Sequence, residues 1–228
     1  MNNCLNTSDV RELDRLAQSL FSIPGLLLME HASLGLAEVL LSLPSDGRRH
    51  FVFICGRGNN GGDGFAAARH IHNRGFPSSV ILAGRLEQIR KGSDAETNAL
   101  IASKMKIPII ECDSSSEVLA HLDAATPDFV IDALLGTGLS SDVRGMLSEV
   151  IDGVNERHLD VTAVDMPSGL NSDTGKPLGT AIIAQRTVTF AFQKMGLARK
   201  EARPFCGEIF VKGIGLPRAV VQDPHAYL

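Results

Sequence analysis

The chain has 228 residues, of which 44% are hydrophobic and 21% are charged, and its formal net charge is −4. This length and this apolar content favour one sizeable α/β domain. The net negative charge does not favour a nucleic-acid polyanion as a partner. The four cysteines are scattered and form no CxxC pair, a pattern typical of reduced thiols rather than of a disulfide framework or a zinc site.

Two helices are predicted near the N-terminus. The Thr-Ser-Asp run at 7–9 can cap a first helix that ends at about Phe21, and Pro24 suits the first turn of a second helix that ends at roughly Leu41. The apolar run 23–29 is too short to span a bilayer and is interrupted by Pro and Gly. No N-terminal signal is visible, so we expect a cytoplasmic protein with no membrane partner.

Short apolar strands alternate with helices along the rest of the chain. The strand candidates are 51–55, 79–83, 107–110, 128–132, 161–165, 186–191 and 208–212. Helical stretches are predicted at 63–74, 92–105, 116–123 and 145–157. Short strands without polar alternation, separated by helices, indicate a mostly parallel sheet that is covered on both faces. Because no long helix separates the last two strands, that edge of the sheet is allowed to depart from the parallel pattern.

Five glycines occupy nine positions between Gly56 and Gly64, directly after the first of these strands. Glycines at this density let the backbone turn sharply and let a ligand approach main-chain N–H groups closely. The helix that follows directs its positive end toward the same place. The segment therefore predicts a loop that binds a phosphate or pyrophosphate, rather than a plain surface turn.

Several nucleotide-binding and hydrolase classes lack part of their motif here. Gly56, Gly58 and Gly61 satisfy G-x-G-x-x-G, but a nicotinamide dehydrogenase also needs an acidic residue at the tip of the second strand, where this chain has Gly84 and Arg85. A serine hydrolase needs the elbow G-x-S-x-G, which the sequence around Ser168 does not provide. No glycine is followed by the Lys-Ser/Thr pair of a P-loop kinase.

Carboxylate, amide and hydroxyl side chains follow three strands at the points where these strands end. The Asn pair 59–60 and Asp63 belong to the glycine run, Asp132 ends the fourth strand, and Asp165 and Ser168 follow the fifth. Parallel sheets bind ligands at the carboxyl ends of their strands, so we expect one shared site, although each aspartate taken singly is equally typical of a turn cap. Oxygen donors of this kind suit a hard cation, and a carboxylate that the cation does not use can act as a general acid or base.

The three segments resemble the motifs of the NAD(P)H-hydrate epimerase family, also called the YjeF N-terminal domain. They are Gly56–Gly64, Asp132–Leu139 and Asp165–Gly169. Further matches are Leu28-Met29-Glu30, Thr187–Phe190 with Lys194 and Gly196, and Gly207-Glu208 leading into Ile214–Pro217, so that the resemblance covers about residues 8–218. Met166 stands where the family usually has Ile, and His31 and Ser33 stand where Asn and Gly are common.

The resemblance implies a Rossmann-like three-layer α/β/α sandwich with a mostly parallel central sheet. It implies a single domain over 1–228, with a helical segment at about 8–41 and the core at about 50–216, commonly assembled as a homodimer. The implied activity is that of an isomerase, which interconverts the R and S 6-hydroxy hydrates of NADH and NADPH (NADHX and NADPHX) and so repairs a damaged cofactor. A separate NAD(P)H-hydrate dehydratase is expected to act in the same pathway, because many relatives carry that activity on a fused second domain.

Site residues follow from the same resemblance, position by position. It implies a potassium ion (K⁺) that is bound by Asn60, Asp132 and Ser168, with backbone carbonyls completing the shell. The implied substrate-binding residues are Asn59, Asn60, Gly61, Gly62, Asp63, Gly136, Thr137, Gly138, Leu139, Ser140, Ser141, Asp142 and Asp165.

The implied reaction needs a proton donor and acceptor near the hydroxyl group of the hydrate. The ring nitrogen expels the neighbouring hydroxyl as water, which leaves an iminium-type cation, and water that returns from the other face inverts the carbon. We predict that Asp165 is the proton donor and acceptor, because Asp132 is committed to the ion. Lys194 is the second catalytic candidate, although a loop lysine is more typically solvated. The alternative function is a non-catalytic nucleotide-binding or interaction protein of the same fold.

Overall fold

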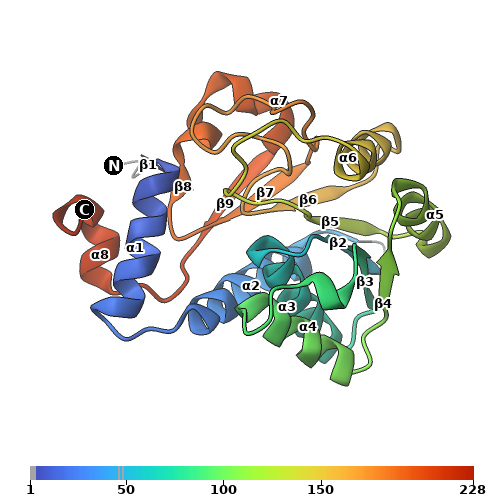
Figure 1. The fold of residues 1–228 in the computed structure, drawn as a ribbon, viewed down its shortest axis with the longest axis horizontal. Helices are drawn as coiled ribbons and strands as arrows, with labels where there is room; N and C mark the ends of the chain where they lie inside the picture. The colour runs from blue at the N-terminus through green and yellow to red at the C-terminus, as the bar shows by residue number, and fades with distance from the viewer. Residues whose placement is uncertain (1–3, 46, 48) are drawn as a thin grey trace.

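The computed structural model describes residues 4–45, 47 and 49–228, and within them it has a seven-stranded sheet in which every neighbouring pair of strands is parallel (Figure 1). The strand order is β4-β3-β2-β5-β6-β7-β9. The strands are β2 (Phe51–Cys55), β3 (Ser78–Ala83), β4 (Ile109–Cys112), β5 (Phe129–Ala133), β6 (Val161–Val164), β7 (Arg186–Phe190) and β9 (Glu208–Lys212). The predicted α/β fold with a mostly parallel central sheet is confirmed, and the seven strand candidates all correspond to strands of this sheet.

Helices cover both faces of the sheet. The helices of the described residues are α1 (Thr7–Ser19), α2 (Gly25–Ser42), α3 (Asn59–Asn73), α4 (Asp94–Lys104), α5 (Ser115–Ala125), α6 (Met146–Glu156), α7 (Arg203–Cys206) and α8 (Arg218–Gln222), and those from α2 to α6 cover the faces. One core cluster packs α2, α3 and α4 against the side chains of one face, such as Phe53 and Ile131. A second cluster packs α5 and α6 against the other face, through side chains such as Ile54 and Val130. The alternation along β2 and β5 therefore divides the strands between two cores, which explains why they read as continuous apolar runs.

The sheet edge at β7 and β9 settles a point that the sequence left open. We allowed this edge to depart from the parallel pattern because no long helix separates the two strands, yet Arg186–Phe190 pairs in parallel with Glu208–Lys212. The crossover is made instead by short pieces: η2 (Met195–Ala198), η3 (Lys200–Ala202) and α7. A parallel connection needs a crossover of sufficient length and not a long helix, and the 17 residues between the strands (191–207) suffice.

The longest apolar helix is α2, which has 18 residues and a mean hydropathy of 1.3, values that would also suit a membrane span. Half of it is buried inside the fold. Its residues Leu36, Ala37 and Leu40 are fully buried and belong to the core cluster with α3 and α4. This packing is typical of a core helix.

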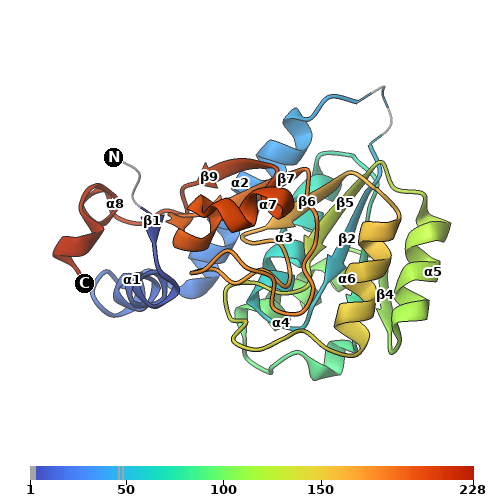
Figure 2. The same cartoon turned by 90° about the horizontal axis from the view of Figure 1, so that it is seen from above.

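A second, two-stranded sheet joins the segment before α1 to the segment that follows β7. β1 (Cys4–Leu5) pairs in parallel with β8 (Gln193–Lys194), which the sequence did not predict. Figure 2 shows α1 and α8 next to each other at one end of the molecule, where the C-terminus also lies. Leu5, Leu13, Phe192 and Val220 form a small core of their own between these elements. As a result, α1 starts from a fixed point beside the strand that carries Lys194.

Candidate active site

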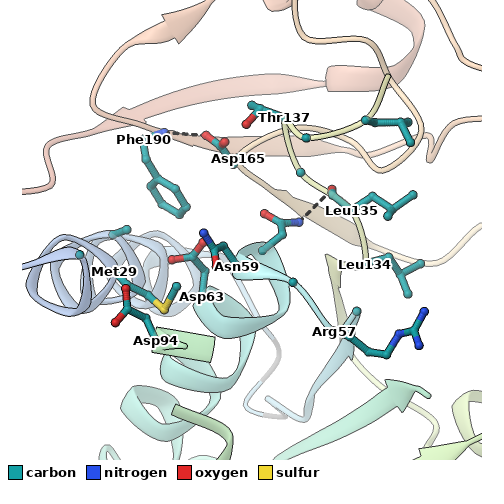
Figure 3. A pocket seen from close by; sticks show the side chains of 18 of the residues that line it. Met29, Arg57, Asn59, Asp63, Asp94, Leu134, Leu135, Thr137, Asp165 and Phe190 are labelled. Atoms are coloured by element: carbon teal, nitrogen blue, oxygen red, sulfur yellow. Dashed lines mark hydrogen bonds between the residues drawn. The ribbon is translucent and has the colours of Figure 1, made fainter. Parts of the chain in front are cut away.

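A cavity of about 1000 Å³ opens at the carboxyl ends of the central strands. The strand order reverses between β2 and β5, the place where open parallel sheets bind their ligands. The segments after β2, β5, β6 and β7 line the cavity, together with α1 and α2 (Figure 3). Small-molecule pockets usually measure about 300–1000 Å³, so this one is large enough for a cofactor-sized ligand.

The glycine run is mostly helix and not a free loop, because α3 begins at Asn59, four residues before the predicted start. A Cβ atom on Gly61 would lie 1.9 Å from the carbonyl oxygen of Gly56, and one on Gly56 would lie 2.0 Å from that of Leu134. These glycines therefore let the end of β2, the first turn of α3 and the end of β5 pack backbone against backbone. Gly58 differs, since a Cβ atom there would meet no atom within 4 Å.

The three predicted ion ligands come together around the carbonyl group of Leu135. The backbone N–H and the hydroxyl of Ser168 donate to the two carboxylate oxygens of Asp132, at 2.8 and 2.5 Å. The Oγ atom of Ser168 also lies 3.1 Å from the carbonyl oxygen of Leu135. The side-chain amide of Asn60 donates to that same carbonyl at 2.9 Å (Figure 3). Oxygen atoms of Asp132, Ser168 and Leu135 are thus gathered at one point between the ends of the strands, and the amide nitrogen of Asn60 borders it.

Asp132 brings a buried negative charge to this point. Burial raises the pKa of its carboxyl group to about 6, although hydrogen bonds from Ser168 and from the N–H of Leu134 act in the opposite direction. A group with this pKa is mostly ionised at neutral pH. The donors that reach it are neutral, and a buried charge without a partner of opposite sign is costly. The chemistry of the cluster therefore fits a bound cation.

Asp165 is held in a strained backbone conformation. Its φ is +63°, which is uncommon for a residue other than glycine. The N–H of Met166 donates to the carbonyl of Val164 at 2.7 Å, so that Asp165 forms the centre of a γ-turn directly after β6. Ala191, with φ +59°, forms the centre of a second such turn after β7. Strained turns of this kind cost free energy and are concentrated at functional sites.

Lys194 is buried against Asp165, which corrects the expectation of a solvated loop lysine. Its ammonium group pairs with Oδ1 of Asp165 and donates to Oγ1 of Thr189 at 3.1 Å and to the carbonyl of Phe190 at 3.0 Å. The Lys194 side chain is only 2% exposed, and that of Asp165 is 15% exposed. The physical reason is long-range: the γ-turn after β7 folds the chain back, and β1 then covers β8.

Most of the predicted substrate-binding residues line the cavity. They are Asn59, Asn60, Asp63, Gly136, Thr137, Gly138, Leu139 and Asp165. Gly61 and Gly62 do not line it, because they are buried where α3 packs against neighbouring backbone. Ser140, Ser141 and Asp142 are exposed and lie outside the lining.

The cavity is also lined by residues that the sequence analysis did not predict as site residues. They include Arg11, Asp14, Met29, Arg57 and Phe190. Asp14 and Arg11 come from α1, whose helical character was visible in the sequence but whose place over the carboxyl edge of the sheet was not. Burial raises the pKa of Asp14 to about 6; the Lys194 ammonium opposes this shift and the Asp165 carboxylate adds to it.

We expect Asp14 to make the free energy of unfolding fall as the pH rises from about 4 to about 6. The folded carboxyl group keeps a proton that the unfolded chain, with its ordinary pKa near 3.9, has already released, so its stabilising contribution is lost as the pH rises through the folded value. Urea unfolding of the wild type and of Asp14→Asn should differ by an amount that changes by up to about 2 kcal/mol over this range. A difference that stays constant with pH would contradict the shift.

Comparison with known proteins identifies the family. Residues 25–196 match the family model described as YjeF-related protein N-terminus. The chain is 35% identical over 214 residues to the NAD(P)H-hydrate epimerase of Rhodopirellula baltica, which covers 94% of this chain and 85% of that one. It is 34% identical over 218 residues to the NAD(P)H-hydrate epimerase of Lentilactobacillus buchneri, which covers 96% and 97%.

Two further matches differ in kind. The chain is 38% identical over 231 residues to the bifunctional NAD(P)H-hydrate repair enzyme Nnr of Moorella thermoacetica, and it spans 97% of its own length but only 42% of that relative. The crystal structure of the yeast protein ynu0 (YNL200c) superimposes with a TM-score of 0.79 at 22% identity, over 95% of this chain and 91% of that one, which shows the shared fold. Together, the family-model match and the relatives above 30% identity show that this chain belongs to the YjeF-related N-terminal domain family.

Proposed function

We propose that this protein is an NAD(P)H-hydrate epimerase, which interconverts the R and S 6-hydroxy hydrates of NADH and NADPH. One observation carries the proposal: the buried pair of Asp165 and Lys194 lines the same cavity as Asn60 and Leu135. Leu135 in turn contacts the buried pair of Ser168 and Asp132. The relatives at 34% and 35% identity, which bear this name and match along most of both chains, support it.

We propose that the first turn of α3 and the segment after β5 bind the pyrophosphate of the hydrate. A helix leaves its first N–H groups without intrahelical partners, and they attract anions. Asn59 and Asn60 occupy this turn and line the cavity, opposite Gly136–Leu139. The nicotinamide ring would then extend toward the ends of β6 and β7.

We propose that Asp165 transfers the proton at the reacting carbon. Lys194, Thr189 and the N–H of Phe190 all approach its Oδ1 atom, which leaves Oδ2, among the described residues, without a donor. Figure 3 shows Asp165 and Phe190 bordering the cavity together. Oδ2 can therefore exchange a proton with a hydroxyl group or a water molecule at the ring, while Oδ1 keeps the side chain in place.

We further propose that the oxygen cluster binds potassium. Asp132, Ser168 and the carbonyl of Leu135 would hold the ion through hard oxygen atoms. Asn60 would join them through its side-chain oxygen once its amide, which now directs its nitrogen at Leu135, turns over. The ion would supply a positive charge that balances Asp132 and would fix the segments after β2, β5 and β6 relative to one another. No proton transfer needs to pass through it.

Potassium is expected to stabilise the wild type against unfolding, because an ion that binds only the folded state shifts the equilibrium toward it, by about 2.7 kcal/mol at a hundred times its Kd. In thermal unfolding at equal ionic strength, KCl should give a Tm several degrees above that in tetramethylammonium chloride. Asp132→Asn should abolish this difference, whereas Asp142→Asn, an exposed aspartate outside the cavity, should keep it. Equal Tm values for the wild type in both salts would contradict the site.

The activity itself is tested with the pure R hydrate of NADPH. The protein should accelerate appearance of the S form, measured by chromatography, well above the rate in an enzyme-free control, which is needed because the hydrate can epimerise unaided. If the protein bound the hydrate but left this rate unchanged, the alternative of a non-catalytic nucleotide-binding protein would be the better description.

Two relationships to other chains complete the proposal. The Moorella relative is a bifunctional repair enzyme, and this chain matches 42% of it. We propose from the family resemblance that an NAD(P)H-hydrate dehydratase acts on the same hydrates. A homodimer is proposed from the family resemblance, and sedimentation equilibrium would measure it directly.

A further inference from the structure

One face of helix α1 forms a wall of the cavity. Val10, Arg11, Asp14 and Gln18 lie along this face at helical spacing, and all four line the cavity. The N-terminal end of this helix is anchored by two contacts. β1 pairs with the strand that carries Lys194, and the backbone N–H of Thr7 donates to the carboxylate of Asp173 at 2.7 Å. Asp14 is therefore presented to the cavity by a helix whose start is fixed.

The cavity near Asp14 contains more carboxylates than cations. Asp14 on α1, Asp63 on α3 and Asp165 after β6 share it with one ammonium group, that of Lys194 on β8. Lys194 already pairs with Asp165 and donates to two further oxygen atoms. Among the described residues, no side chain or backbone N–H donates to the Asp14 carboxylate. Asp14 thus has no structural partner that explains its position.

The reaction needs proton-transfer groups at two places. Inversion requires the hydroxyl group to leave one face of the ring and a water molecule to add to the other. A proton must therefore be given to the leaving oxygen on one side of the carbon and taken from the entering oxygen on the other. Asp165 can serve only the side that its Oδ2 atom faces, because Oδ1 is occupied.

We propose that Asp14 is a second catalytic residue, which works with Asp165 as a pair of proton carriers on the two faces of the ring. This inference rests on the proposed epimerase function. In one direction, Asp14 gives its proton to the hydroxyl oxygen, the C6–O bond breaks, the lone pair of the ring nitrogen forms a C=N bond, and water leaves. A water molecule then adds to the opposite face, the C=N electrons return to nitrogen, and the proton of the entering water passes to the Asp165 carboxylate. The reverse direction exchanges the two roles, and solvent restores the resting protonation state.

The surroundings of Asp14 keep its carboxyl group protonated to a higher pH than that of an ordinary aspartate, which suits a proton donor whose activity declines as the pH rises. Burial raises its pKa to about 6, the Lys194 ammonium opposes the shift, and the Asp165 carboxylate adds to it. Asp63 also faces Asp14 across the cavity, and burial raises the pKa of the Asp63 carboxyl group well above the ordinary value. On its own helix, Arg11 is one turn away and donates to the carbonyl of Thr137 at 3.3 Å. Two carboxyl groups whose surroundings differ in this way are typical of an acid and base pair.

The test compares two variants that each remove one negative charge from α1. Asp14→Asn changes the cavity face. Glu12→Gln is the matched control, because Glu12 lies on the outer face, where it pairs with Arg15 in solvent. Initial rates of conversion of the pure R hydrate of NADPH are measured from pH 5 to pH 8.5 against an enzyme-free control, together with KM and Tm. Asp14→Asn should lower kcat by about 10²–10⁴-fold with KM changed by less than about threefold, and it should lose the decline in rate at alkaline pH that the wild type and Glu12→Gln show.

Three results would overturn this inference. If Asp14→Asn kept the wild-type kcat and the same decline in rate at alkaline pH, Asp14 would carry no proton in the reaction. Loss of activity with a parallel rise in KM and fall in Tm would show a structural role. If Asp63→Asn removed the alkaline decline while Asp14→Asn kept it, the role would belong to Asp63. In all three cases the wild type and Glu12→Gln remain active, so the proposed function stands; if they too matched the enzyme-free control, that function itself would fail, and this inference with it.

Discussion

Asp165→Asn is expected to lower the rate of epimerisation by about 10²–10⁴-fold, the usual contribution of a positioned acid or base. The substitution preserves the shape of the side chain, so the hydrogen bonds at Oδ1 from Thr189 and from the N–H of Phe190 can still form. It removes the negative charge, however, and leaves the Lys194 ammonium buried without its counter-ion. Breaking a buried pair from one side typically costs about 3–5 kcal/mol. We therefore expect lower stability as well as lower activity.

A second variant separates these two effects. In Asp165→Asn/Lys194→Met both charges are removed, and methionine replaces most of the buried lysine side chain. Removing a buried pair as a whole is often neutral for stability, so the free energy of unfolding measured in urea should recover toward the wild-type value. The epimerisation rate should not recover, because the proton carrier is still missing.

The opposite outcome would reverse the assigned roles. If Asp165→Asn kept nearly full activity while Lys194→Met lost it at unchanged stability, the lysine would be the proton carrier and Asp165 its support. Substrate affinity should be measured for each variant, since a loss of binding would indicate a displaced γ-turn after β6 rather than lost chemistry.

The sequence predicted the architecture well because the relevant signals are local. Short apolar strands that alternate with helices indicated the parallel sheet, and each strand candidate corresponds to an observed strand. The pairing of β7 with β9 was left open, because a crossover built from short helical pieces between residues 191 and 207 has no periodic signal. The pairing of β1 with β8 joins two-residue strands almost 190 positions apart, and strands this short carry no signal at all.

The site was predictable where chemistry follows the end of a strand, and not where distant segments close over it. Asp132, Asp165 and Ser168 could be placed at one edge because they follow parallel strands. Burial of Lys194 depends on β1, and the position of Asp14 depends on how α1 is anchored at Thr7. Neither contact is signalled by a local pattern in the sequence. The glycine run was found correctly. Some of its glycines allow backbone segments to pack closely and others border the cavity, and sequence spacing alone does not separate the two kinds.

Gly61→Ala and Gly58→Ala distinguish these two kinds of glycine. At Gly61 the added methyl group would lie 1.9 Å from the carbonyl oxygen and 2.8 Å from the carbonyl carbon of Gly56. Both atoms belong to the backbone and cannot rotate away, so the first turn of α3 would have to move away from the end of β2. Overpacking usually costs about 1–3 kcal/mol and more where the backbone must shift. We expect Gly61→Ala to lose about 3 kcal/mol or more of stability, with loss of activity, because the same turn carries Asn59 and Asn60.

Gly58→Ala is expected to keep wild-type stability within about 0.5 kcal/mol. Its φ of −97° is accessible to alanine, and the methyl group would meet no atom within 4 Å. Gly58 does line the cavity, however, directly before α3. If the absence of a side chain at Gly58 allows the pyrophosphate to approach the helix N-terminus, Gly58→Ala should weaken binding of the hydrate in calorimetry. The urea unfolding curve of this variant should match that of the wild type. Unchanged affinity in Gly58→Ala would show that this approach is not needed, and wild-type stability in Gly61→Ala would show that the backbone contact with Gly56 is not what the glycine provides.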